Sequence, residues 1–177
     1  MLPIKSFITV GSLRPESFNR MISKALIAVA PKSVILEILE ISRLPMCNQD
    51  EDEPPPKEWI DFQQRMKCFD AVIFVVPEYN RFVSGGHKKL KDEASGPFGQ
   101  NASDAQPGAV ISVSVGSLGA VGLNHHLHRS LVFLNMPKMR QPENYISDAA
   151  KIFEAKGNLN NESSRHFLTD FMKSFVT

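Results

Sequence analysis

The stretch that decides the fold is Gly11-Ser12-Leu13-Arg14-Pro15-Glu16-Ser17-Phe18-Asn19, which joins a predicted strand to a predicted helix. Residues 4–10 before it are mostly apolar and predict a buried strand. Residues 21–29 after it carry apolar side chains at helical spacing. Because α/β sheets bind ligands at the carboxyl ends of their strands, the sequence predicts an α/β fold with a ligand site in this turn.

The side chains of this turn suit a phosphate group. Short hydroxyl and amide groups and one guanidinium precede a helix start with unpaired backbone N–H groups. The candidate phosphate ligands are Ser12, Arg14, Ser17 and Asn19. A phosphate-free turn, in which Ser17 only caps the helix, is the other interpretation that these residues leave open. The chain has no G-x-x-x-x-G-K-[ST] and no G-x-G-x-x-G motif, which argues against an ATPase and a Rossmann site.

Composition predicts one domain spanning residues 1–177. The chain has 177 residues, of which 42% are hydrophobic and 22% charged, enough for one sizeable core. Its 20 Lys and Arg residues nearly balance 19 Asp and Glu residues, so nucleic acid and anionic membranes are not expected partners. We recognise no export signal and no long apolar segment, and we expect a cytoplasmic protein. Cys47 and Cys68 form no C-x-x-C pair and are interpreted as buried or incidental thiols.

The rest of the chain predicts alternating strands and helices. Further strands are expected at residues 34–39, 71–76, 109–115 and, for a short fifth strand, near 137–140. The predicted inner faces of the later helices are Trp59, Ile60, Phe62, Met66 and Phe69; Leu123, Leu127, Leu131 and Leu134; and Phe167, Leu168, Phe171, Met172 and Phe175. This alternation predicts a doubly wound parallel sheet, since a barrel needs about eight such units.

Two further motifs accompany the first turn. The strand at 71–76 ends in P-E-Y-N, residues 77–80, and the strand at 109–115 leads into S-V-G-S-L-G, residues 114–119. With G-S-x-R-x-x-S-x-N at 11–19, the set resembles the NADPH-dependent FMN reductase family of flavodoxin-like proteins over nearly the whole chain. In the family's P-G-x-L-K-N-x-x-D helix motif, the glycine, lysine and aspartate match Gly85, Lys88 and Asp92. Ser84, His87 and Lys89 replace the proline, leucine and asparagine.

The resemblance implies a flavodoxin-like, five-stranded parallel sheet of order 2-1-3-4-5 with helices on both faces. In that order the first and third strands flank the topological switch point, so the loops after them are neighbours. The resemblance places the FMN phosphate in the first loop and the isoalloxazine edge against Pro77–Asn80 and Ser117–Gly119. The implied cofactor-binding residues are Ser12, Arg14, Ser17, Phe18, Asn19, Pro77, Glu78, Tyr79, Asn80, Arg81, Ser117 and Gly119.

Residues 78–80 on their own are also typical of an ordinary polar turn. Arg81, where the family often has glycine, places a cation beside the expected flavin edge and is hypothesised to attract the NADPH phosphate or an anionic acceptor. Ser84, in place of the family's proline, loosens the segment that follows. A family member that has lost the flavin is therefore an alternative that the sequence leaves open.

The implied function is an FMN-dependent NAD(P)H oxidoreductase. Hydride passes from the nicotinamide of NADPH or NADH to flavin N5 and then, in a ping-pong cycle, to a small-molecule acceptor: a quinone, a free flavin, an azo compound or a metal oxyanion. Because the flavin carries the chemistry, no catalytic side chain is named. The resemblance also suggests a homodimer or homotetramer. The alternative is a flavodoxin-like electron carrier without NAD(P)H activity, but such carriers are usually strongly acidic and this chain has a net charge of +1.

Other chemistries lack support in the sequence. His125, His126 and His128 are interpreted as surface or interface residues rather than metal ligands, and Lys88, Lys89 and Lys91 as a solvated helix face. A hydrolase would need a G-x-S-x-G elbow, which is missing. A phosphorylation receiver domain would need acidic residues at the ends of the first and third strands, where residues 10–12 and 76–78 supply only Glu78.

Overall fold

A parallel sheet runs through the centre of the molecule. The computed structural model describes residues 2–46, 48–51, 53–96, 101–154 and 157–176. The parallel strands are β1 (Ile4–Val10), β2 (Val34–Leu39), β3 (Ala71–Tyr79), β5 (Gly108–Val113) and β6 (Asn144–Ile146). Their order is β2-β1-β3-β5-β6, and the short strand β4 (Phe82–Val83) pairs antiparallel with the end of β3. The predicted order 2-1-3-4-5 is therefore confirmed.

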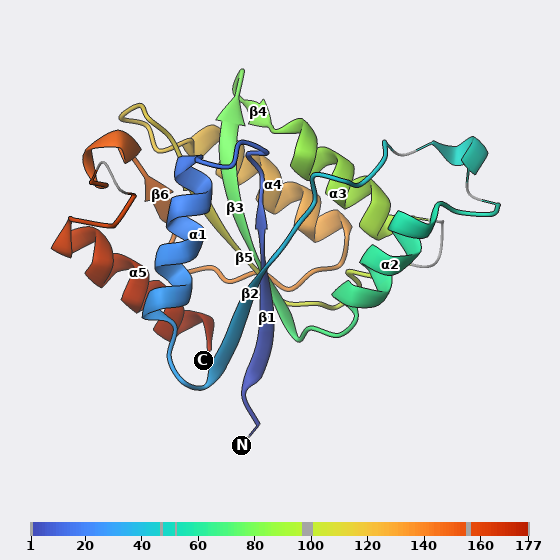
Figure 1. Cartoon of the computed structure of the whole chain (residues 1–177), viewed down its shortest axis with the longest axis horizontal. Coiled ribbons are helices and arrows are strands. Elements are labelled where there is room, and N and C mark those ends of the chain that lie inside the picture. Colours follow the sequence, from blue (N-terminus) through green and yellow to red (C-terminus); the bar gives the residue numbers. More distant parts are fainter. Residues whose placement is uncertain (1, 47, 52, 97–100, 155–156, 177) are drawn as a thin grey trace.

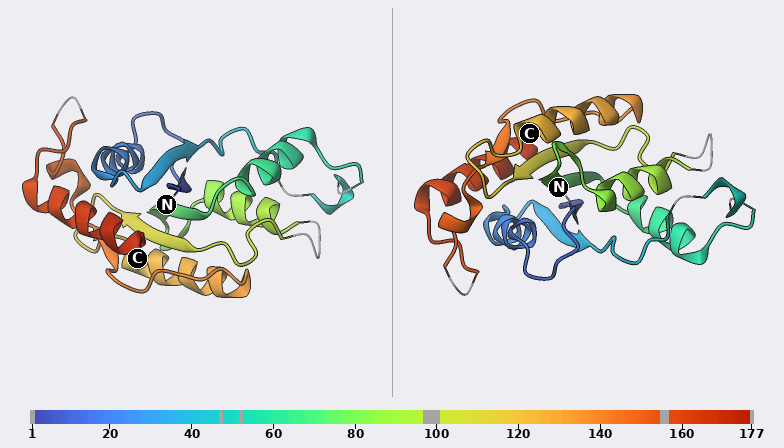
Figure 2. Two further views of the ribbon diagram at one scale, coloured as in Figure 1. Left: turned by 90° about the horizontal axis from the view of Figure 1, so that it is seen from below. Right: turned by 90° about the horizontal axis from the view of Figure 1, so that it is seen from above.

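Helices cover both faces of this sheet. The helices α1 (Phe18–Val29) and α5 (Glu162–Phe175) lie on one face. The other face is covered by α2 (Lys57–Met66), α3 (Gly85–Ser95) and α4 (Val121–Phe133). Figure 1 shows the two groups on opposite sides of the strands, and Figure 2 shows the same layers from below and above.

Side chains that alternate along the strands build two apolar cores. In β1, Phe7 packs under α2, α3 and α4, whereas Ile8 and Val10 pack under α1 and α5. The central strand β3 is buried at every position from 71 to 77, as its unbroken apolar sequence predicts for a strand covered on both faces. On the final helix, Leu168, Phe171 and Met172 are fully buried, and the Asn161 side chain caps its first turn.

Two expectations about elements are wrong. The fifth strand lies at 144–146 rather than 137–140, where Lys138 makes only an isolated bridge to Gly108. Pro142 has no backbone N–H to donate, so ladder pairing resumes only beyond it. Ile60 was expected on the inner face of its helix but is 39% exposed. The buried stripe of α2 consists of Trp59, Phe62 and Met66. Ile60 lies outside this stripe and therefore faces solvent.

Cys68 is exposed and forms no disulfide, which agrees with an incidental thiol rather than a buried one. The interpretation of Cys47 lies outside the described residues. Within the described part of the chain, no helix is long and apolar enough to cross a membrane.

Candidate functional site

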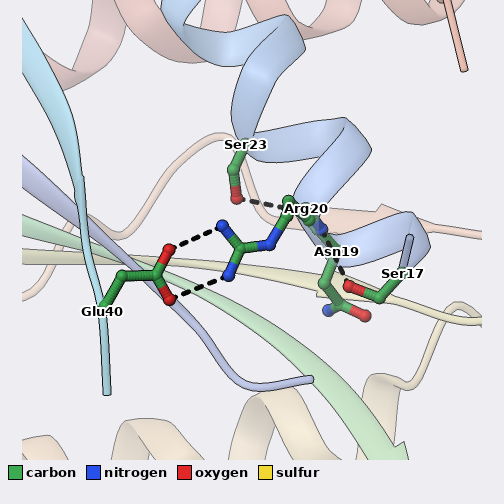
Figure 3. A network of polar contacts seen from close by, with 5 residues as sticks. All are labelled: Ser17, Asn19, Arg20, Ser23 and Glu40. Carbon is green, nitrogen blue, oxygen red and sulfur yellow. Dashed lines mark hydrogen bonds and ion pairs between the residues drawn. The ribbon is translucent and has the colours of Figure 1, made fainter. Parts of the chain in front are cut away.

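The first loop leads into a capped helix with an unpaired amide in its first turn. Ser17 is the N-cap of α1, and its Oγ accepts a hydrogen bond from the Arg20 N–H at 3.2 Å. The Asn19 side chain is 4% exposed, and its Nδ2 has no hydrogen-bond partner among the described residues. Figure 3 shows Ser17 and Asn19 at this first turn. A buried donor without an acceptor is costly, and at a helix N-terminus it suits an anion that brings oxygen atoms.

Sequence reasoning missed the ion pair that braces this turn. The Arg20 guanidinium donates to both Glu40 carboxylate oxygens, at 2.7 and 2.9 Å, and Figure 3 shows it turned toward Glu40. The hydrogen bonds from Arg20 lower the pKa of Glu40. No sequence spacing joins these two residues, since Glu40 follows another strand. Arg14, in contrast, is exposed and forms no ion pair with the residues that the structure describes, so its guanidinium is available to a ligand.

The first and second loops meet, as the strand order predicts. The Tyr79 hydroxyl donates to Ser12 Oγ at 3.4 Å, although Tyr79 ends β3 and Ser12 lies in the loop after β1. Gly11 leaves room for the side chains of His87 and Pro77 against the start of the first loop. A Cβ added to Gly11 would lie 2.1 Å from His87 Nδ1 and 2.7 Å from Pro77 Cδ, closer than real carbon atoms come.

The second motif is a strand end and a tight turn rather than a loop. Pro77–Tyr79 continue β3, and Asn80 and Arg81 both have positive φ, +51° and +63°, in a two-residue hairpin to β4. Turns of this kind fit the right-handed twist of the strands that they join. The hairpin leaves Tyr79 and Phe82 half exposed at the sheet edge that carries the first loop.

The Glu78 carboxylate is held by helix α4. Its Oε2 accepts from the Leu123 backbone N–H at 3.1 Å, and its Oε1 accepts from Arg81 at 3.2 Å. The residue at the N-cap of α4 is Ala120, which has no side-chain acceptor of its own. Glu78 therefore satisfies a free N–H of that helix and ties the second loop to the third.

Replacement of Glu78 by alanine is expected to lower the free energy of unfolding by about 1–2 kcal/mol, because α4 loses its acceptor and favourable charge. Urea unfolding of the cofactor-free protein measures this. Glu78→Gln is the matched control: it keeps a carbonyl oxygen and should lose less. Equal losses in both variants would contradict the capping role.

The third loop is held from behind by side-chain hydroxyls. Ser112 Oγ donates to the Gly119 carbonyl at 2.7 Å, and Ser147 Oγ donates to the Ser117 carbonyl at 2.9 Å. Gly119 has a φ of +57°, and a Cβ there would lie 2.8 Å from the Tyr145 Cβ. The loop is thus fixed in one shape, with Ser117 exposed and Gly119 buried.

Histidines of α4 and lysines of α3 that were not expected to bind a ligand contact other side chains of the fold. The His126 ring packs on Phe82 with centroids 4.3 Å apart, and His125 Nε2 lies 3.4 Å from the Tyr145 hydroxyl. The described residues contain no group of three or more His, Cys, Asp or Glu placed to hold a metal. Lys91 corrects the expected solvated face: it is 9% exposed, and its Nζ donates to Ser130 Oγ, because packing of α3 beside α4 encloses it. Burial lowers the pKa of Lys91.

Comparison with known proteins identifies the family. The sequence profile described as NADPH-dependent FMN reductase matches residues 4–151. The chain belongs to this family. A quinone reductase of Pseudomonas putida is 47% identical over 171 residues, which cover 96% of this chain and 91% of the relative. A 2-hydroxy-1,4-benzoquinone reductase of a Burkholderia species is 36% identical over 175 residues, covering 99% and 96%. The solved structure of FerB, a flavoenzyme NAD(P)H:(acceptor) oxidoreductase from Paracoccus denitrificans, superposes with a TM-score of 0.90 at 34% identity, covering 98% and 95%.

Membership of the NADPH-dependent FMN reductase family confirms the flavodoxin-like fold and makes the protein an oxidoreductase with FMN as cofactor and NAD(P)H as co-substrate. An electron carrier without NAD(P)H activity is not favoured. The groups that the first loop presents are suited to the phosphate of FMN. It offers an unpaired Asn19 amide, a capped helix start and the Arg14 guanidinium, beside the close approach at Gly11.

Proposed function

We propose that this protein reduces quinones with NAD(P)H as a single FMN-binding domain over residues 1–177. The observation that carries the proposal is the buried, unpartnered Asn19 amide at the start of α1, in a loop that contacts the P-E-Y-N hairpin through Ser12 and Tyr79. The names of the relatives, quinone reductase and 2-hydroxy-1,4-benzoquinone reductase, support a quinone as the acceptor.

In this proposal the first loop holds the FMN phosphate through Ser12, Arg14, Ser17 and Asn19, with Phe18 beside it. Pro77, Glu78, Tyr79, Asn80, Arg81, Ser117 and Gly119 border the isoalloxazine edge. Bound FMN supplies a centre that accepts a hydride from nicotinamide and passes it to the acceptor, one substrate after the other. The contributions of the chain are binding, orientation and exclusion of water.

The apolar side chains around this edge suit flat aromatic substrates. Leu13, Tyr79, Phe82 and Leu118 belong to the three loops and are each at least half exposed. Apolar patches rimmed by polar groups are typical of ligand sites. Arg81 adds a cation beside them: its side chain is 73% exposed even though it pairs with Glu78, so it attracts the NADPH phosphate or an anionic acceptor.

We expect the protein to bind FMN and to be reduced by NADPH. Titration with FMN, followed in the visible spectrum, measures binding. Anaerobic NADPH should then bleach the flavin band near roughly 450 nm, and a stoichiometric quinone should restore it. Initial rates with both substrates varied should give the parallel lines of a ping-pong cycle. Bleaching without restoration by any quinone would exclude the proposed acceptor and leave free flavin, azo compounds and metal oxyanions to be tried.

We further propose that the protein is cytoplasmic and works as a homodimer or homotetramer. Support for the assembly comes from Phe133, which is 88% exposed at the end of α4, and from the neighbouring exposed Val132. Large apolar side chains clustered in this way are typical of surfaces that a second subunit covers.

A further inference from the structure

A histidine lies in the core directly beneath the first loop. His87, on the first turn of α3, is 0% exposed, and its Nε2 lies 2.9 Å from Thr9 Oγ1. Phe74 of the central strand borders the ring at 6.0 Å between centroids. The family motif has leucine at this position, so apolar packing alone does not require an imidazole here.

The ring occupies space that Gly11 leaves open. Thr9 and Gly11 are two residues apart, so they face the same side of the extended chain, toward α3. A Cβ on Gly11 would lie 2.1 Å from His87 Nδ1. A Cβ on Gly86 would lie 3.4 Å from the Gly11 carbonyl oxygen. The first turn of α3 therefore supports the start of the first loop at two adjacent points.

The imidazole is neutral in this position. Burial, with a smaller contribution from the charge of Lys91, lowers the pKa of His87 to about 3, and a hydrogen bond with the Thr9 backbone opposes this shift only in part. Nδ1 has no hydrogen-bond partner among the described residues. The imidazole therefore bonds to Thr9 through Nε2, and this bond fixes the orientation of the ring against Gly11.

We propose that His87 is a positioning residue for FMN: through its bond to Thr9 and its contact with Gly11, it holds residues 11 and 12 in the shape that receives the phosphate. This inference rests on the proposed placement of the FMN phosphate in the first loop. His87 itself does not contact the cofactor. It acts by keeping the loop ready before FMN arrives, which reduces the ordering that binding requires.

Riboflavin provides the measurement that separates this role from plain core packing. It has the ring system and ribityl chain of FMN but lacks the phosphate. The His87→Leu variant fills the space without the bond to Thr9, and we expect its dissociation constant for FMN to rise about five- to tenfold, the effect of one net hydrogen bond. The dissociation constant for riboflavin should stay unchanged. Fluorescence titration of the purified full chain measures both.

Three variants serve as controls. Thr9→Val removes the other partner and should reproduce the loss for FMN, whereas His87→Gln keeps a polar group near Nε2 and should recover most of the affinity. Leu90→Ala removes a side chain of the same helix that is 1% exposed. It should lower the melting temperature without changing the ratio of the two dissociation constants.

Two failures give different patterns. If the wild-type protein binds riboflavin as tightly as FMN, the proposed phosphate site is wrong. If the wild-type protein prefers FMN and His87→Leu keeps that preference in full, the phosphate site stands and the role of His87 is overturned. A parallel loss for both ligands in His87→Leu, equal to that in Leu90→Ala, would likewise reduce His87 to core packing.

Discussion

Replacement of Gly11 by alanine is expected to weaken FMN binding about tenfold to a hundredfold, which equals about 1.4–2.8 kcal/mol and lies within the range typical of overpacking. The added methyl would lie 2.1 Å from His87 Nδ1 and 2.7 Å from Pro77 Cδ. Neither neighbour is the free end of a flexible side chain, so the backbone of the first loop has to move. Because this loop contacts the second loop through Ser12 and Tyr79, the shift should disturb both parts of the site. Titration with FMN measures the loss, and far-ultraviolet circular dichroism checks that the fold is kept.

Gly85→Ala is the matched control for this prediction. A Cβ added to Gly85 meets nothing within 4 Å, and the residue begins α3. Alanine is a better helix former than glycine, so this variant should keep its affinity for FMN and have an equal or slightly higher melting temperature. Full affinity in Gly11→Ala would show that the loop is more adaptable than its packing indicates.

The meeting of the loops after β1 and β3 could be predicted because it depends only on strand order. Apolar runs identify the strands, and right-handed crossovers between parallel strands leave few possible arrangements. The contact between Tyr79 and Ser12 is a direct consequence of that order. The capping role of Ser17 was also accessible, since it depends on neighbours within one turn of helix.

Side-chain contacts that do not follow from strand order were not accessible from the sequence. The pairing of Arg20 with Glu40 and the capping of α4 by Glu78 join residues from different elements, and no local period marks them. Lys91 was wrongly expected in solvent because burial of a lysine depends on which helix lies beside it. The fifth strand lies at 144–146 rather than near 137–140, beyond Pro142, which has no backbone N–H to donate to the ladder.

Replacement of Asn19 by leucine is expected to weaken FMN binding without lowering the stability of the cofactor-free protein. The Nδ2 of this 4% exposed side chain has no acceptor among the described residues, so the cofactor-free fold bears the cost of an unsatisfied donor. Leucine is similar in size and has no polar atom. The free energy of unfolding without FMN should therefore stay the same or rise by about 1 kcal/mol. The dissociation constant for FMN should rise about tenfold to a hundredfold, since a charge-assisted hydrogen bond to phosphate is lost.

Asn124→Leu separates this behaviour from that of a buried amide whose Nδ2 has hydrogen-bond acceptors. The Asn124 Nδ2 donates to Ser112 Oγ and to the Asn144 carbonyl, both at 3.3 Å, so its removal should lower the free energy of unfolding by about 1–3 kcal/mol. Urea unfolding of both variants without FMN makes the comparison. If Asn19→Leu destabilises the cofactor-free protein as Asn124→Leu does, then Asn19 serves the fold rather than the phosphate. If Asn19→Leu raises the free energy of unfolding and Asn124→Leu lowers it, then the Asn19 amide destabilises the cofactor-free fold and is kept because a ligand satisfies it.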